Sequence, residues 1–66
     1  MPSIFDDAFY EALARDLLER DGPDVVLRLR LEVIEARREG HSRGAELLVQ
    51  IADAAERLLR QTEQAN

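Results

Sequence analysis

The sequence predicts an all-α protein of three helices, with the second and third in an antiparallel hairpin and the chain assembled as a homodimeric helical bundle. Apolar residues recur at helical spacing in three stretches, 3–20, 23–39 and 42–61, and a glycine follows each of the first two. The 66 residues make one domain. A core of this size alone rarely stabilises a fold, so we expect a second subunit to complete it.

The first stretch, 3–20, is predicted as a helix because one face of it is apolar. Ser3 can cap its N-terminus, and acidic residues follow in the first turn, where free N–H groups favour negative charge. Gly22 and Pro23 end the helix, since glycine adopts the left-handed conformation and proline cannot continue the hydrogen-bond ladder. We expect this helix either to cover the hairpin or to reach across to another subunit. Its apolar row at i+4 spacing is Phe5, Phe9, Leu13 and Leu17.

The second stretch, 23–39, allows two interpretations. Apolar residues alternate with charged ones between positions 27 and 33, which is the period of a half-buried strand. We favour a helix, because the stretch is long for a strand and no second strand-like run exists to pair with it. A strand over 25–34 would need an identical strand from another subunit. As a helix, the stretch has one apolar row at Val26, Leu29, Val33 and Ala36 and an adjoining row at Leu27, Leu31 and Ile34.

The helical interpretation places two arginines, Arg30 and Arg37, inside the apolar stripe. In one interpretation their stems pack on the stripe while the charged heads reach the rim. In the other they form ion pairs across a subunit or partner interface, since a buried arginine needs a carboxylate partner.

The third stretch, 42–61, has the clearest helical pattern. Gly40 is expected to close the preceding helix and Ser42 to cap this one. Alanines alternate with larger residues, so a neighbouring helix can approach closely at the alanines. The two parallel apolar rows are Leu47, Ile51, Ala54 and Leu58 beside Leu48, Ala52, Ala55 and Leu59.

The apolar stripes exceed what a chain of this length can bury, so we predict that part of them forms an interface between subunits. Two hairpins joined face to face would give a four-helix core. The residues assigned to this interface are Phe5, Phe9, Leu13, Leu17, Leu29, Val33, Leu48, Ile51, Ala55 and Leu58.

Leucines and glycines between positions 12 and 59 follow a recognisable spacing. Leu17-Leu18-x-Arg20-x-Gly22 is followed by a long helix and then by Gly40, Gly44, Leu48, Ile51, Ala54-Ala55 and Leu58. This resembles a family of short, uncharacterised bacterial helical proteins with the pattern LI-x-RHG, a long helix, GD-x-x-G and W-x-x-I-x-x-AI-x-x-L. The chain departs from that pattern at Asp21, His41, Leu48 and Ala55. The resemblance implies the three-helix fold and no particular activity.

The composition bears on which covalent and metal sites the protein can have and on where it is located. The chain has no cysteine and one histidine. Disulfides are therefore excluded and a zinc site lacks its usual ligands, so we expect no cofactor and no metal. No stretch approaches the ~20 apolar residues of a membrane span, and no basic segment followed by an apolar run marks a secretory signal. We therefore expect a cytoplasmic protein that does not enter the membrane.

Catalytic residues are not expected either. His41 is the only histidine, the residue type that serves most often in acid–base catalysis near neutral pH. A turn in so small a domain rarely supplies the pocket and the second group that acid–base catalysis needs. The glycines Gly40 and Gly44 lack the lysine and the preceding strand of a phosphate-binding loop. The protein is therefore not expected to be an enzyme.

The net charge of −5 weighs against general binding to a phosphate backbone. The middle of the chain is less acidic, and its arginines are candidate contacts for an anion or a partner: Arg28, Arg37, Arg38 and Arg43. We expect a small non-enzymatic interaction or regulatory module that acts as a homo-oligomer, with a dimer favoured. The alternative is a nucleic-acid-linked regulator, antitoxin-like or a repressor accessory factor, that uses the arginines of 23–39.

Overall fold

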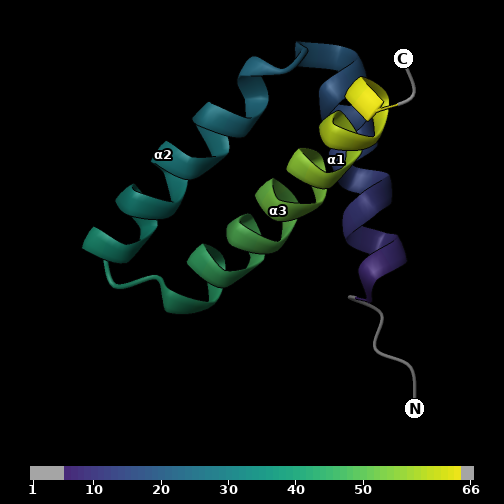
Figure 1. The fold of residues 1–66 in the computed structure, drawn as a ribbon. Helices are drawn as coiled ribbons and strands as arrows, with labels where there is room; N and C mark the ends of the chain where they lie inside the picture. Colours follow the sequence, from purple (N-terminus) through teal and green to yellow (C-terminus); the bar gives the residue numbers. More distant parts are fainter. Residues whose placement is uncertain (1–5, 65–66) are drawn as a thin grey trace.

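The computed structural model describes residues 6–64, and this part of the chain forms three helices without strands, so the fold is all-α as predicted. The helices are α1 (Asp7–Asp21), α2 (Asp24–Arg38) and α3 (Ser42–Gln64). Residues 25–34, for which a strand was the alternative, lie within α2. Figure 1 shows α2 and α3 side by side and joined by a short turn, while α1 crosses the C-terminal half of α3.

α1 begins at Asp7 rather than near Ser3. Asp6 is its N-cap, and the Asp6 carboxylate accepts a hydrogen bond from the Phe9 N–H at 3.0 Å. Asp7 lies in the first turn, where negative charge is stabilising. Ser3, which the sequence suggested as the cap, lies outside the described residues.

The break between α1 and α2 occurs at the predicted Gly22 and Pro23. Gly22 has φ 81° and ψ −175°, and its N–H donates to the Leu18 carbonyl at 2.9 Å. Pro23 takes the cap position of α2, where its missing N–H leaves no hydrogen bond unmade. The pair therefore turns the chain sharply without an unsatisfied backbone donor.

Gly40 closes α2 in the left-handed conformation, with φ 79°. The N–H of Gly40 donates to the Arg37 carbonyl at 3.1 Å, and the N–H of His41 donates to the Ala36 carbonyl at 2.8 Å. These two bonds form a Schellman motif, which satisfies the last carbonyls of the helix. Ser42 is the first residue of α3 rather than the residue that caps it, because the His41 carbonyl already accepts from the Ala45 N–H at 2.9 Å.

α3 forms the centre of the core, and its alanines lie where the other helices come close. Ala54 and Ala55 are fully shielded from solvent and cluster with Tyr10 and Ala14 of α1. Because alanine has no atoms beyond Cβ, the two helix backbones can approach each other closely. The half-buried residues packed around this cluster are Phe9, Leu18, Val26, Ile51 and Leu58.

On another side, α3 packs against α2. Ala52, which is fully shielded, clusters with Val25 and Leu29. The half-buried residues around this second cluster are Leu17, Leu18, Val26, Leu48 and Ile51. Among the described residues, no large side chain is completely buried. The core is therefore thin, and most large aliphatic side chains lie at its edges.

The described helices also bear on the expected relation to membranes. None of the helices within residues 6–64 combines the length and the apolar character that crossing a bilayer requires.

Gly22→Ala is expected to lower the free energy of unfolding by about 1–3 kcal/mol, because side chains with a Cβ avoid this backbone region. Urea denaturation followed by circular dichroism measures the change. Gly44→Ala is the matched control. Gly44 lies in α3, where an added Cβ would meet the His41 Cβ at 3.8 Å, an ordinary contact. This control is expected to gain about 0.5 kcal/mol. A Gly22→Ala protein as stable as Gly44→Ala would contradict the assigned backbone conformation.

Candidate interaction surface

α2 carries apolar side chains on two opposite sides. An inner row faces the core and is 2–5% exposed: Val25, Leu29 and Val33. An outer row is 65%, 57% and 48% exposed: Leu27, Leu31 and Ile34. Since successive helical residues turn by about 100°, the two rows lie on nearly opposite sides of α2. Large aliphatic side chains exposed in one continuous row are unusual for a monomer.

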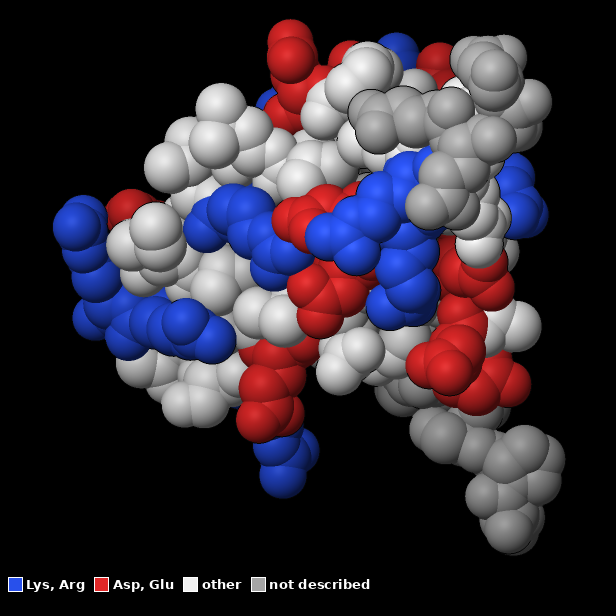
Figure 2. All heavy atoms as spheres, viewed as in Figure 1, with Lys and Arg blue, Asp and Glu red and all other residues white. Residues whose placement is uncertain are grey.

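Uncharged and charged side chains occupy different regions of the molecular surface. Figure 2 shows uncharged side chains gathered over α2 on one face of the molecule. Where α2 and α3 meet, acidic and basic side chains are interleaved on that face. The view contains no broad surface of a single positive sign, which a phosphate backbone would require.

Arg30 connects α2 to α3 at the rim of the core. Its Nε donates to Glu56 Oε1 at 3.2 Å, and its Nη2 donates to Asp53 Oδ1 at 2.9 Å and also to Glu56 Oε1. These hydrogen bonds, that to Glu56 first and that to Asp53 second, raise the pKa of Arg30 above its ordinary value. The side chain remains 36% exposed. Arg30 therefore reaches the rim, and its ion pairs lie within the chain rather than across a subunit interface.

The other candidate arginines are not gathered into one site. Arg28 forms an ion pair with Asp21 at 3.4 Å. Arg37 and Arg43 line a hollow that includes neither Arg28 nor Arg38, and Arg38 is exposed at the end of α2. Because these four arginines lie apart, they do not form a continuous basic surface along α2.

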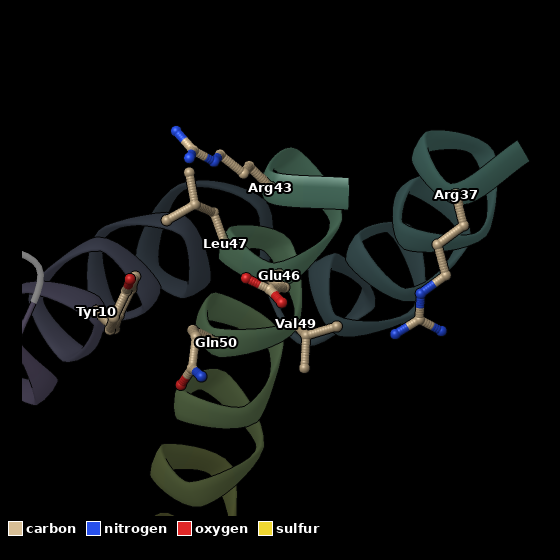
Figure 3. Close-up of a pocket in the computed structure, with 7 residues that line it drawn as sticks. All are labelled: Tyr10, Arg37, Arg43, Glu46, Leu47, Val49 and Gln50. Carbon is tan, nitrogen blue, oxygen red and sulfur yellow. The ribbon is translucent and has the colours of Figure 1, made fainter. Parts of the chain in front are cut away.

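The hollow has a volume of about 640 Å³ and lies over the N-terminal half of α3. Figure 3 shows Tyr10 of α1 at one end, Arg37 of α2 at the other, and side chains of α3 between them. No histidine or serine lines it, and His41 and Ser42 are exposed in and beside the turn. The lining offers hydrogen bonds and ionic contacts but no serine–histidine or paired-carboxylate arrangement. The α3 residues that line the hollow are Arg43, Glu46, Leu47, Val49 and Gln50.

Most residues that the sequence assigned to an interface lie in or beside the core of the chain itself. Leu29, Val33 and Ala55 are buried, and Leu13 is 36% exposed. Phe5 lies outside the described residues. Their assignment to an interface stays a prediction. The half-buried members are Phe9, Leu17, Leu48, Ile51 and Leu58.

The sequence analysis named Leu27, Leu31 and Ile34, at i, i+4 and i+7 spacing, as an apolar row of this helix but did not assign them to the interface. Only the position of α3 distinguishes the two rows.

Neither a metal cluster nor a known relative points to a function. Within residues 6–64, no three His, Cys, Asp or Glu side chains gather so that they could hold a metal ion. No known protein family, curated protein or solved structure matches the chain. The resemblance drawn from the leucine and glycine spacing stays an interpretation of the sequence.

A double-mutant cycle on Arg30→Met and Glu56→Gln is expected to give a coupling energy of about 0.5–1 kcal/mol, because the pair is partly exposed and partly screened by solvent. The measurement is the free energy of unfolding of the four proteins at low and high salt, and the coupling should shrink as salt increases. The control is the pair Arg20 and Asp16, which are 71% and 60% exposed at 3.6 Å. A coupling for Arg30 no larger than that of this control would show that the contact does not secure α2 to α3.

Proposed function

We propose that the chain is a small, non-enzymatic protein–protein interaction module that acts as a homo-oligomer, with the outer row of α2 as its contact surface. The observation that carries this proposal is the exposure of Leu27, Leu31 and Ile34 on the side of α2 away from the core. A dimer of antiparallel α2–α3 hairpins is the smallest closed assembly that would cover the row. The proposal keeps the cytoplasmic location expected from the sequence.

The thin core supports the proposed dimer, because a second copy would add the apolar burial that the single chain lacks. The buried residues of α3 are alanines, and they contribute little apolar area compared with leucine or phenylalanine. A chain of 66 residues is also close to the size at which small domains rely on association, a metal or disulfides for stability. Covering the outer row would add apolar burial where the single chain lacks it.

A nucleic-acid role finds less support. Arg28 and Arg30 of α2 are both engaged by carboxylates. These contacts neutralise the positive charge that counterion release from a nucleic acid would need. Contact with protein is therefore the better explanation of the surface.

Leu31→Glu is expected to convert a dimer into a monomer that remains folded. A charge in the centre of the outer row would be desolvated at an interface, whereas Leu31 is 57% exposed in the single chain. Light scattering on a sizing column gives the mass at several micromolar concentrations, and circular dichroism reports the helical content.

Leu47→Glu is the matched control, because Leu47 is an apolar residue of α3 that is 40% exposed and lies outside the outer row. It should keep the dimer mass. A wild-type protein that is monomeric and folded at all these concentrations would overturn the proposal, as would a Leu31→Glu variant that keeps the dimer mass. Charges at Ile51 or Leu58 would be less informative, because both pack in the core of the single chain.

A further inference from the structure

The outer row of α2 is accompanied by four charged residues whose order suits a second copy of the same helix. Asp24 precedes the row and Arg38 follows it, and Arg28 and Glu35 lie between them. All four side chains are exposed. From the N-terminus the signs run negative, positive, negative, positive. Read from the C-terminus, the signs run positive, negative, positive, negative. Two copies of the helix that run in opposite directions therefore place a positive charge opposite each negative one.

Helical geometry places these charges at the outer row rather than at the core. At about 100° per residue, Asp24 and Arg38 fall in line with the row, and Arg28 and Glu35 fall on its flank. The opposite flank carries Arg30, which already binds two carboxylates of α3. Arg37 is exposed on the same flank as Arg30. On the other flank Glu35 is exposed, and Arg28 stays 57% exposed although it pairs with Asp21 at 3.4 Å.

The direction of pairing follows from which residues would meet. In a parallel pair, Asp24 would face Asp24 and Arg38 would face Arg38, which is repulsive. In an antiparallel pair centred near Leu31, Asp24 faces Arg38 of the second copy and Arg28 faces Glu35 of the second copy. Each attraction occurs twice, because a two-fold interface is self-complementary.

We propose that a second copy of the chain binds α2 against α2 in the antiparallel direction, about a two-fold axis close to Leu31. This inference rests on the proposed function and adds the identity, direction and register of the partner. Leu27 then packs against Ile34 of the second copy, and the two copies of α2 lie at the centre of the assembly. Because the inner row faces the other way, α3 of each copy lies on the outside.

Engineered cysteines test the register, since the chain has none of its own. An equimolar mixture of Arg28→Cys and Glu35→Cys chains, treated with a short bifunctional thiol reagent, is expected to give the mixed cross-linked dimer, identified by mass spectrometry. Each variant alone should give little product, because its two thiols lie about 10 Å apart along the helix axis. Arg57→Cys, exposed on α3, is the control for random collision and should cross-link with neither.

The possible outcomes separate this inference from the function on which it rests. Efficient cross-linking of each variant with itself would overturn the antiparallel register while leaving self-association in place. A dimer that cross-links in no combination would overturn the contact through α2. A wild-type chain that light scattering finds monomeric would overturn the proposed function itself.

Charge reversal gives an independent test, because the proposed register and the net charge predict opposite changes in the dissociation constant. Glu35→Arg changes the net charge from −5 to −3, which on its own would reduce repulsion between copies and tighten association. In the proposed register it sets two arginines against each other twice, so the dissociation constant is expected to rise roughly tenfold. Adding Arg28→Glu in the same chain reverses both partners and should restore the wild-type constant. Tighter association of the Glu35→Arg variant, or failure of the double variant to recover, would overturn the register.

Discussion

The close approach of α1 and α2 to the alanines of α3 is the constraint on which the rest of the structure depends. Ala52 meets α2, and Ala54 and Ala55 meet α1, with no atoms beyond Cβ to hold the helices apart. Such contacts leave little interior space for large side chains. The leucines and isoleucines that contact these clusters lie at their edges and are only half-buried, as Leu18, Leu48, Ile51 and Leu58 are.

Arg30 completes the contact between α2 and α3 where the apolar core ends. One guanidinium spans two carboxylates, Asp53 and Glu56, that lie about one helical turn apart on α3. Because 36% of the Arg30 side chain stays exposed, the pair neutralises these charges at the rim of the core rather than in its interior. Arg37 is exposed on the same flank of α2 but lies toward the C-terminal end of the helix.

The sequence was informative wherever a local rule determined the structure. Gly22, Pro23 and Gly40 marked the helix ends correctly, because their effects on the backbone do not depend on distant residues. Asp6 caps α1, a residue type that suits an N-cap as well as serine does, and Ser3 lies outside the described residues.

Residues of α2 were harder to assign, because the helix has two apolar rows of similar strength. Which row faces inward depends on the position of α3, and so does the identity of the Arg30 partners. Neither is encoded in local spacing. For the same reason, the interface assigned from the sequence combined buried residues such as Val33 with exposed ones such as Leu13.

The way in which α1 joins the molecule has a consequence for its motions. α1 packs chiefly on α3, has few contacts with α2, and is linked to α2 through the sharp corner at Gly22 and Pro23. Its C-terminal end does not share this isolation, because Leu17 and Leu18 pack against the cluster of α2 and α3. Amide hydrogens in the first turns of α1 are therefore expected to exchange with solvent through local opening, before those in the middle of α3.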